Sequence, residues 1–255
     1  TGGKPVYAQM SGIVRGMLQS EVLVCKGLKI GDIDARCCPE HCMTISDKAR
    51  SVGGGVLEAV SVFAQIHHKY GIALLAAGES RRFGSDKLSE VYQGMPLYRH
   101  TLQKLEAFSS LPRVVVTARK DLAREASVLG IHIAENRHPE LGISHSVALA
   151  LEELLLQDPE LEGVLFLVCD QPQIQVSTIQ KLLKEGCFHK NSIVCAGCEG
   201  HRGNPVLWGR GYFHELRALS GDTGGRQLMQ KYDDAIRIVE CEPQELKDID
   251  RREDM

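Results

Sequence analysis

The feature that most constrains this chain is an apolar run that leads directly into a loop of small residues. Residues 71–75, GIALL, are typical of a buried strand, and residues 76–87 follow as AAGESRRFGSDK. Ala, Gly and Ser let backbone N–H groups close around an anion, and Arg82 and Lys87 add two cations. The glycine spacing matches neither the dinucleotide-binding Rossmann fingerprint nor a Walker A loop. These residues therefore predict a strand followed by an anion-binding loop, with a flexible loop as the structural alternative.

Residues 70–255 alternate between apolar runs of strand length and amphipathic stretches of helix length. We expect strands at residues 72–76, 113–117, 164–169, 192–196, 204–208 and 235–239. We expect helices at residues 97–108, 122–129, 146–157 and 177–185. This alternation predicts an α/β fold in which helices cover both faces of a largely parallel sheet. Ligands bind such sheets at the carboxyl ends of the strands, so the active cleft is expected there.

Two segments that carry carboxylates are candidates for a metal site. Asp170 directly follows the apolar run at residues 163–168, at the expected carboxyl end of a strand. Mg²⁺ favours one or two carboxylates together with substrate phosphates, which makes Asp170 a candidate ligand. An Asp in this place is also a common turn or cap residue. Far downstream, Asp248 and Asp250 offer a second carboxylate, although such an acidic segment can equally be a solvated helix start.

Together these motifs resemble the nucleotidyltransferases that attach a nucleotide to molybdopterin, in particular the molybdenum cofactor cytidylyltransferases. The LAxGxSxRxGxxK pattern of that family is matched at Leu75, Ala76, Gly78, Ser80, Arg82, Gly84 and Lys87. Residues 170–172 match its Asp-Gln-Pro, and residues 248–250 match its DIDTPEDL segment, with Arg251 and Arg252 where Thr and Pro are usual. Residues 136–146, 200–207 and 220–226 resemble its NPxxxxGxxSSL, GxxGxPVLF and GDxGAR segments, with His145 where Ser is commoner.

The resemblance implies a three-layer, Rossmann-like nucleotidyltransferase fold with a mostly parallel sheet. It implies an enzyme that transfers CMP from CTP to the terminal phosphate of molybdopterin and releases pyrophosphate, in the maturation of molybdenum hydroxylases. The residues that it assigns to catalysis are Arg82, Lys87 and Asp170, and those that would hold the cofactor Mg²⁺ are Asp170 and Asp250. It assigns to nucleotide binding Leu75, Ala76, Ala77, Gly78, Ser80, Asn136, Ser144 and Ser146. It assigns to acceptor binding Asn204, Pro205, Asp222 and Arg226.

The expected partners are a nucleoside triphosphate, the molybdenum cofactor, and an apo-molybdenum hydroxylase that would receive the product. CTP is favoured because Ala77 gives LAAG, as in the cytidylyl branch, whereas the guanylyl branch reads LAGG. One methyl group in a pocket discriminates by roughly 1–3 kcal/mol. The alternatives are a guanylyl or sugar-phosphate nucleotidylyltransferase, or a non-catalytic protein that binds and delivers the cofactor. Retention of Arg82, Lys87, Asp170 and Asp250 favours an enzyme.

Residues 1–66 are expected to form a separate, small β-rich domain before the nucleotidyltransferase domain at residues 70–255. Short apolar pairs broken by glycines resemble part of a barrel-sandwich fold of the biotinyl or lipoyl type, without its Met-Lys-Met hairpin. Residues 44–50 and 53–59 resemble the end of an accessory protein associated with selenium-dependent molybdenum hydroxylases. A short solvated linker is expected at residues 65–70. The chain starts at Thr1 and enters in mid-pattern, as a fragment or processed product would.

Cysteine usage and charge narrow the setting. The nine cysteines include a cluster at Cys37, Cys38 and Cys42 with His41, but adjacent cysteines rarely reach one ion with good geometry. The odd number and the lack of a disulfide framework favour free thiols in a reducing cytoplasm. A net charge of -3 with no basic run argues against nucleic acid as a partner. No apolar stretch approaches the roughly 20 residues that span a membrane.

Overall fold

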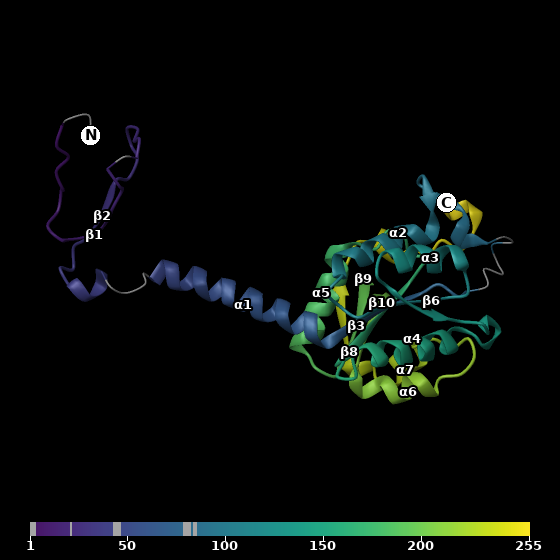
Figure 1. Ribbon diagram of the computed structural model, residues 1–255. Helices are drawn as coiled ribbons and strands as arrows, with labels where there is room; N and C mark the ends of the chain where they lie inside the picture. Colours follow the sequence, from purple (N-terminus) through teal and green to yellow (C-terminus); the bar gives the residue numbers. More distant parts are fainter. Residues whose placement is uncertain (1–3, 21, 43–46, 79–82, 84–85) are drawn as a thin grey trace. The chain divides into compact units, whose positions relative to one another are not determined.

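The computed structural model describes residues 4–20, 22–42, 47–78, 83 and 86–255. The chain divides into two compact units, Thr1–Val60 and Ser61–Met255, and each is described by itself. Figure 1 shows the ribbon, coloured along the sequence. The second unit contains the expected nucleotidyltransferase-like portion.

In the first unit, two short strands pair with each other. Strands β1 (Ile13–Met17) and β2 (Gly31–Asp34) are antiparallel, and a 3-10 turn, η1 (Pro39–Cys42), follows them. The Asp34 carboxylate accepts hydrogen bonds from the backbone N and the guanidinium of Arg36, at 2.8–3.0 Å. Among residues of this unit whose burial the structure describes, Asp34 alone is buried. This pair of strands does not show the barrel-sandwich fold that the glycine pattern predicts.

Helix α1 (Asp47–Lys69) follows, where the sequence predicts the end of a β-rich unit and then a solvated linker. The expectation of a linker at residues 65–70 was wrong, because helix and then strand occupy these positions. Three consecutive glycines at residues 53–55 hid the helix, since glycine is the weakest helix former after proline. Val52, Val56 and Val60 nevertheless recur at helical spacing.

The second unit is built on a seven-stranded sheet in the order β11-β9-β10-β8-β3-β6-β7. Its strands are β3 (Tyr70–Leu75), β6 (Arg113–Thr117), β7 (His132–Glu135), β8 (Gly163–Val168), β9 (Ile193–Cys198), β10 (His201–Gly209) and β11 (Ile236–Glu240). Neighbouring strands are parallel, except that β10 is antiparallel to both β8 and β9. The prediction of a mostly parallel sheet is confirmed.

Helices cover both faces of this sheet and make the second unit three layers thick (Figure 1). One face carries α2 (Leu97–Lys104), α3 (Lys120–Val128) and α5 (Val176–Phe188). The other carries α4 (Ile143–Gln157), α6 (Phe213–Ala218) and α7 (Arg226–Lys231). The central strand β3 shows why two layers are needed, because successive side chains point to opposite faces. Ile72 and Leu74 join one buried core, and Ala73 and Leu75 join the other.

Several elements of this unit were not expected from the sequence, including the helices α6 and α7, an edge strand and a short hairpin. Strand β7 is an edge strand in which two of the four residues are exposed, so it lacks the apolar run by which the other strands are recognised. A short hairpin, β4 (Val91–Tyr92) with β5 (Met95–Pro96), lies between the small-residue loop and α2. Its turn uses Gln93 and Gly94 with positive φ, as tight hairpins with the twist of the strands require.

Candidate active site

A cleft of about 610 Å³ lies at the carboxyl ends of β3 and β8. The two strands are adjacent and parallel, so the small-residue loop after Leu75 and the carboxylate after Val168 come to the same edge of the sheet. This is the edge at which open α/β sheets bind ligands. The expected site residues that line the cleft are Leu75, Ala76, Ala77, Gly78, Lys87, Ser146, Asp170, Asp222 and Asp250.

At the cleft, one lysine faces two carboxylates that are far apart in the sequence. The Nζ of Lys87 lies 3.0 Å from Oδ2 of Asp170 and 3.5 Å from Oδ1 of Asp250. The Lys87 side chain is only 10% exposed, whereas those of Asp170 and Asp250 are 31% and 51% exposed. A nearly buried ammonium requires such partners, because an unpaired charge in the interior is strongly disfavoured.

Asp250 reaches the cleft because the C-terminal segment docks on the loop after β8. The backbone N–H of Ile249 donates to the carbonyl O of Asp170 at 2.9 Å, and the Ile249 side chain is buried at 1% exposure. The Gln171 Nε2 donates to the carbonyl O of Leu246 at 3.2 Å. The segment then turns at Asp254, whose Oδ2 accepts from the backbone N of Asp250 at 3.1 Å.

The carboxylate of a third residue, Asp248, interacts electrostatically with Asp170, Asp250 and Lys87. Desolvation raises the pKa of Asp248, and the negative charges of Asp170 and Asp250 raise it further. Neighbouring negative charges repel one another, so a cation placed among them is stabilising. Lys87 supplies one such cation within the chain.

The donor set fits Mg²⁺ shared with a substrate rather than a metal caged by protein. Among residues that the structure describes, no group of three or more His, Cys, Asp or Glu is arranged to hold a metal ion. Asp170 and Asp250 both reach one Nζ atom, so their oxygens converge on a common point. Two carboxylates that leave the remaining positions to water and phosphate oxygens are the usual magnesium arrangement.

The small-residue loop begins with a braced strand end. The Thr117 Oγ1 donates to the carbonyl O of Ala76 at 3.2 Å, which ties the end of β3 to the end of β6. Ala77 and Gly78 then line the cleft, and a Cβ at Gly78 would meet no atom of the described residues within 4 Å. Two further expected residues, Ser80 and Arg82, lie outside the described part of the chain.

The residues expected on the nucleotide side divide between the cleft wall and its support. Ser146 lines the cleft from the first turn of α4. Asn136 is fully buried behind it, and its Nδ2 donates to Oγ of Ser146 at 3.0 Å. Ser144 donates through Oγ to the carbonyl O of Gly221 at 2.7 Å. The structure thus brings one of these three side chains to the cleft and places the other two where they hold its wall.

The start of α4 and the loop at Gly221–Asp222 approach each other closely at Gly142. A Cβ added at Gly142 would lie 2.5 Å from the carbonyl C and O of Gly221, and φ there is +82°. Glycine tolerates both conditions, which other residues do not. This close approach places the loop beside the start of α4, and Asp222 lines the cleft.

The other expected acceptor residues lie apart from the cleft lining. Asn204 and Pro205 sit where the register of β10 shifts against β9, between Gly203 and Val206. Because β10 runs antiparallel to β8, its first residues belong to the same sheet edge as Asp170. Arg226 is exposed at the start of α7. Of the described residues that line the cleft, none is Asn204, Pro205 or Arg226.

Several cleft residues were not anticipated from the sequence. Apolar contacts come from Phe83, Leu88, Ile143 and Val168, while Pro139 and Glu140 contribute from the segment between Asn136 and Gly142. The last two fall inside a matched motif but at its variable positions, so only the spacing could have indicated them. The apolar residues carry no chemical signal and look like core in the sequence.

Neither the cluster at residues 37–42 nor the Cys-x-x-Cys pair at Cys195 and Cys198 forms a metal site among the described residues. Cys38 donates through Sγ to Oε2 of Glu40 at 2.8 Å, and the side chains of His41 and Cys42 lie outside the described residues. Cys195 and Cys198 are three residues apart on β9, so their side chains point to opposite faces of the sheet. They therefore cannot converge on one ion.

The fold and the cleft together define a class of protein, the nucleotidyltransferases with a small-residue loop at the first strand of a three-layer α/β sheet. The family model described as "MobA-like NTP transferase domain" matches residues 72–236, and the chain belongs to this family.

Relatives among curated proteins agree. A "Probable molybdenum cofactor guanylyltransferase" of Pyrococcus horikoshii is 29% identical over 167 residues, covering 66% of this chain and 81% of that protein. The "Purine catabolism protein PucB" of Bacillus subtilis is 26% identical over 194 residues, covering 71% and 91%. A separate similarity, 48% identity over 59 residues, is to the "Uncharacterized protein YqeB" of Escherichia coli. That match covers 23% of this chain and only 11% of the length of YqeB.

Solved structures show the same fold. Rv0371c of Mycobacterium tuberculosis superposes with a TM-score of 0.62 at 22% identity, covering 73% of this chain and 95% of that chain. A nucleotidyl transferase of Methanothermobacter superposes with a TM-score of 0.57 at 19% identity, covering 73% and 94%. Within the described part of the chain, the helices include none with the length and apolar character needed to cross a membrane.

Proposed function

We propose that this chain transfers a nucleoside monophosphate from a nucleoside triphosphate to the terminal phosphate of molybdopterin, with release of pyrophosphate. The observation that carries this proposal is the placement of Lys87 against Asp170 and Asp250 in the cleft that the small-residue loop borders. Molybdopterin is proposed as the acceptor because of the motifs and because the Pyrococcus horikoshii relative is named for the molybdenum cofactor. We extend the proposal to the maturation of molybdenum hydroxylases, with an apo-hydroxylase as receiver of the product.

The proposed reaction is an in-line displacement at phosphorus. An oxygen of the pterin phosphate forms a bond to the α-phosphorus, and the bond from that phosphorus to the bridging α–β oxygen breaks. The electron pair and the charge leave with pyrophosphate. The attacking phosphate is already ionised, so the protein needs to position the reactants and neutralise charge rather than remove a proton.

The chain's own groups meet these needs. Lys87 would exchange its contacts with the carboxylates for the phosphate oxygens as the triphosphate enters, and Arg82 would supply a second cation. Asp170 and Asp250 would hold Mg²⁺, which supplies charge neutralisation at the phosphates when bound. Backbone N–H groups from Ala77 onward would cradle the anion, because small residues leave them accessible.

CTP and GTP are the two candidate donors. Ala77 gives the LAAG sequence of the cytidylyl branch, and its methyl group takes up space at the cleft that a glycine would leave open. One relative named above, that of Pyrococcus horikoshii, is a probable molybdenum cofactor guanylyltransferase, and this observation favours GTP. We propose CTP as the donor on the strength of Ala77, with GTP as the second candidate.

Pyrophosphate release, measured with Mg²⁺ and molybdenum-loaded pterin, tests the proposal with CTP, GTP and ATP at equal concentrations. We expect release with CTP, and an Asp170→Asn variant should lower the rate by about 10²–10³-fold because charge stabilisation at the phosphates is lost. Asp234→Asn, a matched change at an exposed position of η6 (Asp233–Ala235), should leave the rate unchanged. Release with GTP alone would overturn the choice of donor. No release with any of the three would move the assignment to another acceptor or to a delivery protein.

A further inference from the structure

We propose that Arg119 is a positioning residue that fixes the turn carrying Lys87 and thereby sets where the Lys87 ammonium lies. This inference rests on the proposed transfer reaction, and it adds a residue that none of the matched motifs contains. Arg119 precedes α3, on the loop after β6. Among the described residues that line the cleft, Lys87 appears and Arg119 does not.

Lys87 is the first residue of a one-turn 3-10 helix, η2 (Lys87–Ser89), whose N-cap position is Asp86. The turn is closed by a backbone hydrogen bond from the N–H of Ser89 to the carbonyl O of Asp86, at 3.1 Å. The hydroxyl of Ser89 also donates to Oδ2 of Asp86, at 3.0 Å. The two residues that flank Lys87 in space are therefore joined by backbone and by side chain.

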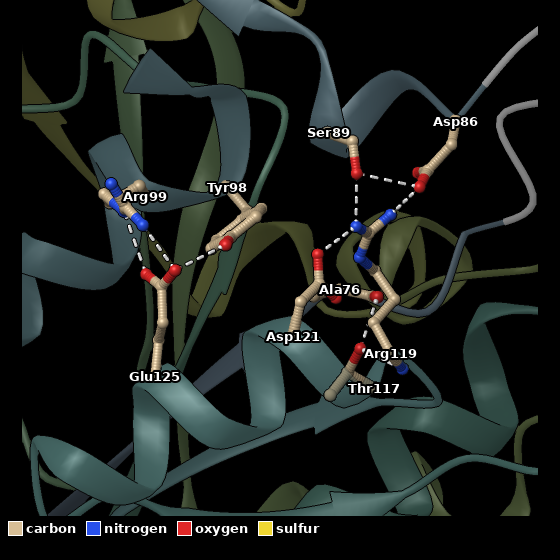
Figure 2. Close-up of polar contacts among 9 residues, drawn as sticks. All are labelled: Ala76, Asp86, Ser89, Tyr98, Arg99, Thr117, Arg119, Asp121 and Glu125. Atoms are coloured by element: carbon tan, nitrogen blue, oxygen red, sulfur yellow. Dashed lines mark hydrogen bonds and ion pairs between the residues drawn. The ribbon is translucent and has the colours of Figure 1, made fainter.

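The guanidinium of Arg119 forms hydrogen bonds to both of these flanking residues, as Figure 2 shows. Its Nη1 donates to Oδ2 of Asp86, and its Nη2 donates to Oγ of Ser89. One planar group thus spans the turn from its first residue to its last. The aliphatic stem of Lys87 leaves this clamped turn and ends between Asp170 and Asp250.

Arg119 is itself held in place by contacts with Asp121, Tyr98 and Thr117. Its Nη2 lies 2.6 Å from Oδ2 of Asp121, and its guanidinium carbon lies 5.7 Å from the centre of the Tyr98 ring. Its backbone N donates to Oγ1 of Thr117 at 3.1 Å, and the same hydroxyl donates to the carbonyl O of Ala76. The Arg119 side chain is only 18% exposed. A continuous set of contacts therefore links the strand end that opens the small-residue loop to the turn that carries Lys87.

The chemistry favours arginine over lysine at this position. A guanidinium offers five N–H donors in a fixed plane and can bridge several acceptors at once, whereas an ammonium is a single charge on a flexible stem. Without the bridge, Asp86 and Ser89 lose the group that holds them to the β6 side of the cleft. A displacement of about 1 Å in a charged group at a reaction centre lowers a rate by about 10²-fold.

Steady-state kinetics of Arg119→Ala, Arg119→Lys and the control Arg99→Ala test the effect on turnover. Arg99 pairs with Glu125 near the same surface, with Nε 2.9 Å from Oε2, and does not contact the turn (Figure 2). We expect Arg119→Ala to lower kcat/KM by about 10–100-fold. Arg119→Lys should recover less than a third of that loss, and Arg99→Ala should change kcat/KM by less than about twofold. Equal losses in Arg99→Ala and Arg119→Ala would overturn the proposal.

A double-variant cycle distinguishes positioning from direct contact with the triphosphate. If Arg119 acts through Lys87, then Arg119→Ala should lower kcat/KM by less than about twofold in a Lys87→Ala background. A loss of the full size in that background means that Arg119 acts by itself, and the proposal fails.

An activity-independent measurement keeps this inference separate from the choice of substrate. Limited acylation of lysines, read by mass spectrometry, reports how freely the Lys87 ammonium reaches solvent. We expect the Lys87 acylation rate to rise at least about fivefold in Arg119→Ala and to stay within about twofold of wild type in Arg99→Ala, with thermal unfolding used to confirm that both variants are folded. A protein without transfer activity that still shows this pattern would refute the proposed function and support the positioning role of Arg119. An unchanged Lys87 acylation rate in a folded Arg119→Ala variant would refute the positioning role of Arg119 and leave the proposed function untouched.

Discussion

Truncation of Ile249 tests whether docking of the C-terminal segment creates the carboxylate pair. Ile249 lies between Asp248 and Asp250, is 1% exposed, and belongs to the core on the α2–α3–α5 face. Its backbone N–H holds the carbonyl O of Asp170 at 2.9 Å. Its side chain is therefore the apolar anchor of the segment that brings Asp250 to Lys87.

The size of the effect follows from burial. Replacing a fully buried Ile by Ala lowers the stability of the packed state by about 2–5 kcal/mol, and replacement by Val lowers it by about 0.5–1.5 kcal/mol. A local segment can detach from a domain without global unfolding, so much of this loss is expressed as undocking. A loss of about 2 kcal/mol corresponds to about a 30-fold shift in the docking equilibrium. We therefore expect Ile249→Ala to raise the Mg²⁺ concentration for half-maximal pyrophosphate release by about tenfold or more.

The matched control is Ile131→Ala. Ile131 is 3% exposed in the same core, but it precedes the edge strand β7 and does not line the cleft described above. Both variants should lower the melting temperature, and Ile249→Ala alone should shift the Mg²⁺ requirement. An unchanged Mg²⁺ requirement in Ile249→Ala would refute the idea that this segment supplies a metal ligand.

Three further predictions address other parts of the domain. Gly142→Ala should lower the free energy of unfolding in urea by about 1–3 kcal/mol more than Gly130→Ala, because both positions have positive φ but only Gly142 has backbone 2.5 Å from the added Cβ; equal losses would contradict this. Ala77→Gly should raise the GTP-to-CTP ratio of kcat/KM by about tenfold or more by removing the methyl group, and an unchanged ratio would remove Ala77 as a specificity residue. Burial lowers the pKa of Lys104 to about 8 from 10.5, so the folded protein loses this proton before the unfolded chain does. The stability of wild type relative to Lys104→Met should therefore rise from about pH 8 to about pH 10.5. A constant difference in melting temperature between the two proteins across that range would show that burial does not perturb this lysine.

Much of the fold was predictable because the elements of the second unit carry strong local signals. Strand β6 lies at residues 113–117, as expected from its apolar run, and α4 buries Val147, Ala150, Leu151 and Leu154 at the spacing of one helical face. Strand β7 was missed because an exposed edge strand needs few apolar residues. The antiparallel direction of β10 was also not predicted, since strand direction depends on the path of the chain rather than on local composition.

The candidate site was predictable to the extent that its residues recur in motifs. Lys87, Asp170 and Asp250 were selected by sequence, and the structure places them within hydrogen-bonding or ion-pair distance. Asn136 and Ser144 were selected too, but they hold the wall through Ser146 and Gly221. Which of several polar residues in a motif faces the ligand depends on side-chain packing, which a linear pattern does not contain.

By itself, the sequence determined the family, the alternation of strands and helices, and the chemical groups available at the strand ends. Only the tertiary structure decided that the segment carrying Asp250 completes the cleft, because Ile249 packs in a core formed mainly by residues far from it in sequence. Only the tertiary structure revealed Arg119, whose partner Asp86 lies 33 positions away. Local preference and periodicity act over a few residues, whereas the position of a charged side chain depends on contacts that close long stretches of chain.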